Sequence, residues 1–238
     1  MTTRTAGQVT DPRGPAGDVD AVAERLRLLV AGLPPQDGVA VFGGLYLTVT
    51  EAVGDRIAAG DLFRSPAEVA ALDVLFAGRF LDALTAPRAP ACWRPLLEFR
   101  LHPGVLPVQF ALCGMNAHIE HDLPLAVLDA CAALGCSPGE LETDFHRVND
   151  VLAQVEEQER ERLMPAPEEL DVAEPLLHLI GSWSIDRARD AAWASAVTLW
   201  ELRDRPGPLA VASAALDDAA GLVCRCLLTP LRSSGRAG

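Results

Sequence analysis

The sequence contains no lysine, and all twenty of its basic residues are arginine. Schiff-base chemistry on a lysine and phosphate binding by a P-loop lysine are therefore excluded. A bound anion must be held by arginine, by backbone N–H groups or by a metal ion. Aromatic residues make up only 5% of the chain, and tyrosine occurs once, as Tyr46. Leucine, alanine and valine must fill the core, and this composition favours helices.

Other absences limit the function. No uninterrupted apolar run reaches the roughly 18 to 20 residues that span a bilayer, and the first residues have no apolar signal-peptide core. We therefore expect a soluble, cytoplasmic protein without membrane insertion. The net charge of −13 argues against binding to nucleic acid. The sequence also lacks a GxGxxG motif after a strand, a GxSxG elbow, a Walker motif and a DDxxD motif.

The cysteines form no CxxC pair. They are Cys92, Cys113, Cys131, Cys136, Cys224 and Cys226. In a cytoplasmic chain they are predicted to be reduced core residues, with disulfides or a thiolate zinc site as alternatives.

Apolar residues recur at helical spacing along most of the chain, and no segment alternates as a strand does. Caps and prolines predict helices at 18–33, 40–60, 65–87, 94–101, 108–134, 137–164, 171–204 (one helix, or two broken near Gly181) and 208–230. Ser65 and Glu68 are expected to form a capping box. The prediction is an all-α, single-domain bundle of about eight helices over 18–230, with a disordered tail at 1–17 and a loose tail at 231–238.

Six segments carry a resemblance to a known family. They are LYLTVTEAV, LDVLFAGRFLDAL, WRPLLE, QFALCGMNAHIEHDLPLAV, DFHRVNDVL and IDRARDAAW, within about 40–230. Together they resemble an actinobacterial family of all-helical proteins described as a domain of unknown function. The most specific part is N-A-H-I-x-x-D-L-P at 116–124. The resemblance implies that His118 and Asp122 belong to the family pattern and that His121 is a feature of this member. It implies a fold and a site, but no activity.

The stretch GMNAHIEHDLPLAV places two histidines and an aspartate in an apolar run. Residues i, i+3 and i+4 share a helix face, so His118, His121 and Asp122 are predicted to point in one direction. His146 and Asp150 repeat the i, i+4 spacing. Facing helices of a bundle can each supply two ligands to a metal. The candidate ligands of a divalent ion (Zn, Fe or Mn) are therefore His118, Asp122, His146 and Asp150.

Two other interpretations of this cluster are open. In a metal-free site, His118 acts as the general base and Asp122 orients it. In a structural site, Pro124 kinks or ends the helix, Asp122 caps the helix that follows, and His118 bonds a backbone carbonyl. An enzyme should bury both residues beside a pocket. An interaction protein should use them as caps and expose an apolar patch elsewhere.

We predict a small-molecule enzyme of bacterial specialised metabolism that works by acid/base chemistry or by metal-assisted hydrolysis, elimination or cyclisation. The catalytic candidates are His118, Asp122, His121, Asp144, Asn149 and Arg187. Arg187 and Arg189 are candidate partners for a carboxylate of the site or for an anionic ligand, and His178 is a further possible metal ligand. The alternative is a non-catalytic binding or interaction protein, and a partner subunit or a homo-oligomer is compatible with either function.

Overall fold

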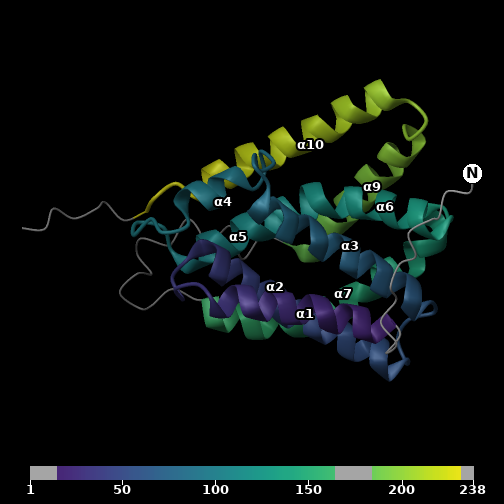
Figure 1. Cartoon of the computed structure of the whole chain (residues 1–238), viewed down its shortest axis with the longest axis horizontal. Helices are drawn as coiled ribbons and strands as arrows, with labels where there is room; N and C mark the ends of the chain where they lie inside the picture. The colour runs from purple at the N-terminus through teal and green to yellow at the C-terminus, as the bar shows by residue number, and fades with distance from the viewer. Residues whose placement is uncertain (1–14, 164–183, 232–238) are drawn as a thin grey trace, which may run out of the picture.

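The computed structural model describes residues 15–163 and 184–231, and these residues form helices with no strand among them (Figure 1). The elements are α1 (Pro15–Ala31), α2 (Gly38–Ala59), α3 (Pro66–Thr85), α4 (Arg94–Phe99), α5 (Pro107–Ala117), the π-helical turn η1 (His118–Asp122), α6 (Leu123–Leu134), α7 (Pro138–Leu163), α9 (Ile185–Glu201) and α10 (Pro206–Leu227). Because α5, η1 and α6 follow one another without interruption, they count as one rod, and the described residues contain eight helical rods. The predicted all-α bundle of about eight helices is confirmed, and its central rod contains a π-helical turn just before Pro124.

Two boundaries differ from the sequence-based expectation. The first helix begins at Pro15, inside the tail predicted for 1–17. The last begins at Pro206, two residues before the expected start at 208. Proline is favoured at the first helical position, because the N–H that it lacks would have no hydrogen-bond partner there. The predicted break near Gly181 and the candidate ligand His178 lie outside the described residues, as do 1–14 and 232–238.

The predicted capping box at the start of α3 is wrong. Ser65 precedes the helix, but its side chain makes no cap hydrogen bond. Asp144 of α7 takes over this role, because its carboxylate accepts the backbone N–H groups of Arg64 at 3.0 Å and Ser65 at 2.7 Å. A tertiary contact has replaced the local one, and it joins α7 to the start of α3.

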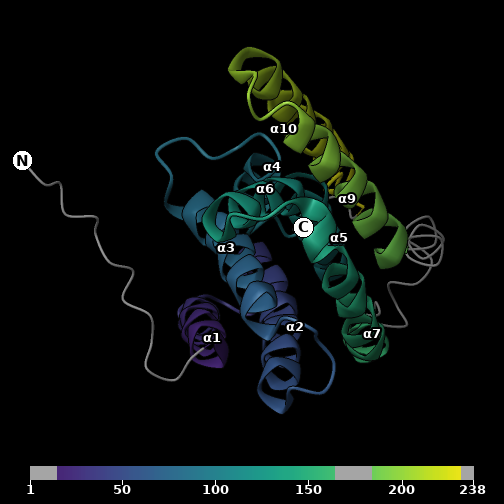
Figure 2. The ribbon, with the colours of Figure 1, turned by 90° about the vertical axis from the view of Figure 1, so that its right-hand side faces the viewer.

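The rod formed by α5, η1 and α6 runs through the middle of the bundle. Helix α1 packs on α2 and α3 on one side of it, and α10 packs on α5 on the opposite side (Figures 1 and 2). Helix α9 packs on α6, and η1 itself contacts α3, α9 and α10. The packing therefore places the histidine-containing turn at the centre of the molecule.

A glycine lets α2 approach α5 near this turn. A Cβ atom at Gly114 would lie 2.2 Å from Cγ of Phe42. Phe42 is buried and has little room to move, since its ring stacks on Tyr46 and meets Phe80 edge to face. We expect Gly114→Ala to lower the free energy of unfolding by about 1–3 kcal/mol.

Gly78→Ala is the matched control for this prediction, because a Cβ atom added at this position on α3 would meet no atom within 4 Å. It should leave stability unchanged or raise it by about 0.5–1 kcal/mol through helix propensity. Urea denaturation of both variants tests the close approach. Equal stability of the two variants would contradict it.

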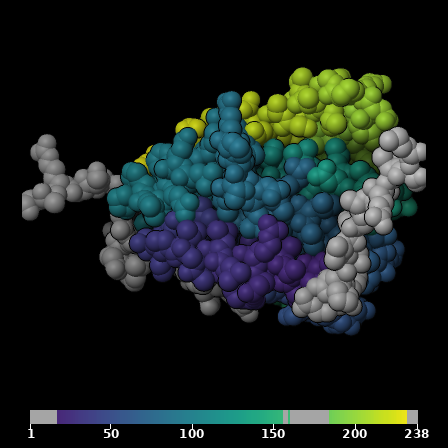
Figure 3. Space-filling model, viewed as in Figure 1, coloured from purple at the N-terminus to yellow at the C-terminus, as the bar shows by residue number. Residues whose placement is uncertain are grey.

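Helix α10 lies along one edge of the molecule (Figure 3) and exposes apolar side chains. Val211, Leu222 and Val223 are 72%, 66% and 45% exposed. Contrary to the sequence-based expectation, α10 is long and apolar enough to cross a membrane, and it is the one such helix among the described residues. Only 17% of its most apolar 18-residue stretch is buried. Core helices of soluble proteins can be equally long and apolar but are mostly buried, which α10 is not, so the absence of membrane insertion stays a prediction. The exposed patch also agrees with the interaction-protein alternative.

Candidate active site

The turn between α5 and α6 is a π-helix. The backbone N–H of Leu123 bonds to the carbonyl of His118, five residues earlier. Pro124 follows within the first turn of α6 and has no N–H to give, so the wider turn lets the helix continue past it. Asp122 has helical dihedral angles (φ −73°, ψ −37°) and makes no side-chain cap bond. The interpretation of Asp122 as a helix cap is therefore wrong.

The Asp122 carboxylate instead accepts three side-chain hydrogen bonds. Trp93 Nε1–H donates to Oδ2 at 2.9 Å, His118 Nδ1 lies 2.9 Å from the same oxygen, and His121 Nδ1 lies 2.8 Å from Oδ1. Burial alone would raise the pKa of Asp122, but the hydrogen bonds from His118 and His121 outweigh burial and lower it. An ionised carboxylate only accepts, so both Nδ1 atoms carry a proton, and each imidazole has a lone pair on Nε2 in its neutral form.

His118 is enclosed by aromatic rings. The Phe76 ring lies parallel to the imidazole with centroids 3.6 Å apart, and the Tyr46 ring meets it edge to face at 4.5 Å. The side chain is buried, and Nε2 has no hydrogen-bond partner. Burial lowers the pKa of His118, although the hydrogen bond to Asp122 partly opposes this shift. At neutral pH His118 is therefore a neutral base with a fixed orientation.

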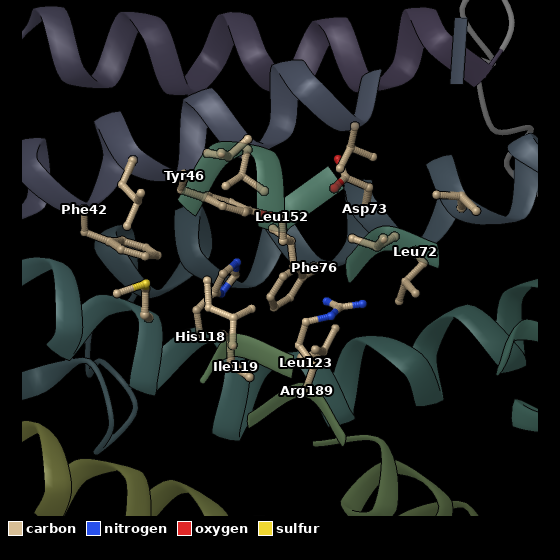
Figure 4. A pocket seen from close by; sticks show the side chains of 18 residues that line it. Phe42, Tyr46, Leu72, Asp73, Phe76, His118, Ile119, Leu123, Leu152 and Arg189 are labelled. Carbon is tan, nitrogen blue, oxygen red and sulfur yellow. The ribbon is translucent and has the colours of Figure 1, made fainter. Parts of the chain in front are cut away.

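A cavity of about 110 Å³ adjoins His118 between α2, α3, α7 and η1. Its walls are mostly apolar, and its polar side chains are Tyr46, Asp73, His118 and Arg189 (Figure 4). Tyr46 Oη, Asp73 Oδ2 and His118 Nε2 are buried without a hydrogen-bond partner. Buried polar atoms are costly unless paired. Three such atoms, on residues that line one apolar cavity, indicate a binding place for a ligand with a polar group.

Two of these groups keep a proton near neutral pH. Burial raises the pKa of Asp73 to about 7. The pKa of Tyr46 is raised well above its ordinary value, first by burial and then by the charges of Asp73 and Asp122. The cavity therefore offers a phenol and a partly neutral carboxylic acid as hydrogen-bond donors, beside the basic Nε2 of His118.

The raised pKa of Asp73 makes stability depend on pH. The folded protein holds this proton more tightly than the unfolded chain. The contribution of the protonated Asp73 to the free energy of unfolding is therefore fully present below pH 3.8 and is lost as pH rises through about 7. Asp73→Asn has no such proton to lose. We expect the free energy of unfolding of Asp73→Asn minus that of wild type to increase by about 2–3 kcal/mol from pH 5 to pH 8.

Thermal unfolding of both proteins at several pH values checks this prediction. Asp82→Asn, on the exposed side of α3, is the control and should show no comparable trend. A constant difference between wild type and Asp73→Asn across this pH range would show that the Asp73 carboxylate is not buried in the folded protein.

Three of the predicted catalytic residues lie away from the cavity. Arg187 is exposed to solvent. Asp144 holds the start of α3, as described above, and also pairs with Arg147 at 3.2 Å. Asn149 accepts a hydrogen bond of 2.6 Å from Nε of Arg189, which lines the cavity wall. The described geometry therefore gives Asp144 and Asn149 supporting roles and gives Arg187 none.

The π-turn also divides the two histidines, which were predicted to point in one direction. His118 lines the cavity, whereas Nε2 of His121 lies 3.9 Å from Oδ1 of Asp217 on α10. The wider turn changes the angular spacing on which the prediction rested. Both residues still meet at Asp122, but they serve opposite sides of the turn.

The four predicted metal ligands do not come together. His146 is half-exposed, with Nδ1 3.6 Å from Oδ1 of Asp190, and Asp150 is exposed on the same helix, whereas His118 and Asp122 are buried. A helix pair with matching spacing forms one site only if the two faces meet, and the face of α7 that carries His146 and Asp150 does not line the cavity beside His118. Among the described residues, ligand atoms converge at a different group, formed by Cys92, His121 and Asp217.

The main residue that the sequence analysis missed is Asp73. It is a single carboxylate within the apolar stretch AALDVLF, and this isolation was a usable signal, because an acid among core positions needs a reason to be there. Cys92 and Asp217 had no local signal, since the two residues lie 125 positions apart in the sequence. The six cysteines form no disulfide in the structure. Four of them are buried, as expected for core residues (Cys92, Cys113, Cys131 and Cys224), whereas Cys136 is partly exposed and Cys226 is exposed.

Comparison with protein families gives a match over most of the chain. The model of a family of unknown function (DUF5995) matches residues 19–230. Comparisons with curated proteins and with solved structures found no match.

Proposed function

The chain belongs to this family of unknown function, and we propose that it is an enzyme that transfers protons on a small, mostly apolar substrate. His118 is the general base, and Asp122 positions it. The observation that carries the proposal is that Tyr46, Asp73 and His118 line one apolar cavity and that each has a buried polar atom without a hydrogen-bond partner. The setting in bacterial specialised metabolism stays part of the proposal.

The size of the cavity limits the substrate. A cavity of about 150 Å³ can hold benzene, so about 110 Å³ suits a compact ring or a short branched chain. Apolar walls favour a hydrocarbon body, and the donors Tyr46 and Asp73 favour one acceptor oxygen on it. The substrate class is a small apolar carbonyl compound.

The chemical step follows from the positions of base and donors. His118 Nε2 removes a proton from the carbon next to the carbonyl, and the C–H electrons move onto the carbonyl oxygen to give an enolate. Tyr46 and neutral Asp73 donate hydrogen bonds to that oxygen; a tyrosine with a neutral carboxylic acid is an established means of stabilising such a charge. Return of the proton to another carbon gives an isomerisation, and loss of a leaving group gives an elimination. No oxidant or reductant is consumed.

Hydrogen–deuterium exchange tests the proposal. The protein is incubated in D₂O with cyclohexanone or 2-cyclohexenone, and loss of the α-proton signal is followed by NMR. We expect exchange faster than in buffer and a decrease of about 10²- to 10⁴-fold in His118→Gln. His146→Gln is the control, because His146 is a half-exposed histidine away from the cavity. No catalysed exchange by the wild-type protein, or equal exchange in His118→Gln, would overturn the assignment of His118 as the base.

Arg189 favours a second candidate function, the non-catalytic binding of a small apolar carboxylate. Its guanidinium is buried at the cavity wall and donates to neutral acceptors, Asn149 Oδ1 at 2.6 Å and the Phe145 carbonyl at 2.7 Å. A buried cation held by neutral groups attracts an anion. Calorimetric binding of isovalerate, a short branched carboxylate, without any exchange of its α-protons or of the ketones would favour this function over catalysis.

A further inference from the structure

A second cluster of reactive side chains lies on the other side of the π-turn. Cys92 precedes α4, His121 belongs to η1, and Asp217 lies on α10; one ligand atom of each lies within 4.8 Å of the other two. His121 Nε2 and Asp217 Oδ1 are 3.9 Å apart, too far for a hydrogen bond. Ligand atoms of a tetrahedral zinc ion lie roughly 3.3 to 3.6 Å apart, given its bond lengths. The group therefore needs only a small contraction to surround an ion.

The imidazole of His121 is oriented as metal-bound histidines are. Its Nδ1–H donates to the Asp122 carboxylate at 2.8 Å, so Nε2 is the nitrogen that faces Asp217 and that can bind a metal ion in the neutral imidazole. A carboxylate behind the distal nitrogen fixes the tautomer and raises the basicity of the metal-binding nitrogen. This hydrogen bond is an observation separate from the convergence of the three ligand atoms.

Asp217 is held in place by the backbone of the segment before α4. The N–H groups of Ala91 and Cys92 donate to its two oxygens at 2.8 and 2.9 Å. One turn later on α10, a Cβ atom at Gly221 would lie 2.7 Å from the carbonyl oxygen of Ala91, so glycine permits the close approach of the two segments. Each carboxylate oxygen has a second lone pair. The backbone bonds therefore orient Asp217 without using its capacity to bind a metal.

We propose that Cys92, His121 and Asp217 bind one Zn²⁺ ion and leave its fourth position open. Thiolate and imidazole ligands favour zinc over magnesium, calcium or manganese. On binding, the ion displaces the proton of the Cys92 thiol to solvent, and the charges of one thiolate and one carboxylate then balance the ion. Asp217 is partly exposed, with 24% of its side chain accessible, so an ion can enter from the α10 side. Three protein ligands and an open position are typical of catalytic zinc.

Metal analysis of the untagged full chain tests this proposal. The protein is equilibrated with micromolar free Zn²⁺ and excess Mg²⁺, dialysed, and analysed by mass spectrometry for metals. We expect about one zinc per chain, and a loss of affinity of at least about 100-fold in Cys92→Ser and Asp217→Asn. Cys226→Ser is the matched control, because Cys226 is exposed at the end of α10.

Cobalt substitution gives a readout at the ligands themselves. Co²⁺ bound by a thiolate shows a charge-transfer absorption that should be present in wild type and Cys226→Ser and absent in Cys92→Ser. Circular dichroism identifies any variant that has not folded, and His121→Gln then serves as the replacement. No zinc in the wild-type protein, or full retention of zinc by folded Cys92→Ser and Asp217→Asn, would overturn the proposal. Neither result depends on activity at the His118 cavity.

Discussion

Asp122→Asn is expected to slow proton exchange by about 10- to 100-fold, and to weaken zinc binding by at least about 10- to 100-fold. The reason is the unequal use of the two carboxylate oxygens. Oδ2 accepts from both Trp93 and His118, whereas Oδ1 accepts from His121 alone. An asparagine will keep its oxygen where two donors meet and turn its NH₂ group toward His121.

The two histidines should therefore respond differently to this substitution. His118 keeps its tautomer and orientation. It loses only the negative charge that stabilises its protonated form, because a charge-assisted hydrogen bond, worth about 1.5–3 kcal/mol, becomes a neutral one. His121 must accept from the asparagine NH₂, so its proton moves to Nε2 and blocks the nitrogen that would bind zinc. NMR of the imidazole nitrogens reports the two tautomers directly.

Asp122→Ala removes the acceptor altogether and is expected to lower the free energy of unfolding by about 3–5 kcal/mol, because it leaves three buried donors without a partner. Asp129→Ala, an exposed aspartate of α6, is the control and should change stability by less than about 1 kcal/mol. Wild-type stability of Asp122→Ala would show that Asp122 does not hold the turn together.

The position of the candidate site could be predicted from local sequence, because its first pair is a local feature. His118 and Asp122 are four residues apart in a helical segment, and this spacing brings side chains together whatever the rest of the chain does. Their hydrogen bond of 2.9 Å agrees with that expectation. The same rule failed for His146 and Asp150, since a shared face on α7 does not decide what the face meets.

The remaining parts of the site depend on tertiary packing. Tyr46 and Asp73 come from α2 and α3, and no spacing in the sequence relates either of them to His118. Pro124 indicated an irregular helix, but a kink, a break and a π-turn satisfy the same local rule. The packing of η1 against α3, α9 and α10 favours the turn that continues the rod. Whether His121 faces the cavity or α10 depends on that choice, which local sequence does not contain.

Filling the cavity is expected to separate its function from the stability of the fold. Val148 of α7 lines the cavity, and Val148→Phe would place a phenyl ring in the space of about 110 Å³. Because the added ring replaces empty volume with apolar contacts, we expect stability to stay equal or to rise by about 0.5–2 kcal/mol. Catalysed exchange and ligand binding should fall at least about 10-fold, since the substrate and the ring compete for one volume.

Val197→Phe is the matched control for this substitution, because Val197 is 39% exposed on α9 and does not line the cavity. Exchange with cyclohexanone, calorimetric titration with isovalerate and thermal unfolding would be measured on both variants. A cavity needed for function predicts a stable Val148→Phe protein that neither binds nor exchanges, beside a Val197→Phe protein that does both. If Val148→Phe kept full exchange, the substrate would have to reach His118 Nε2 from outside this cavity. The assignment of the cavity as the substrate site would then be wrong. The zinc content of Val148→Phe should be unchanged, because Cys92, His121 and Asp217 lie on the other side of the π-turn.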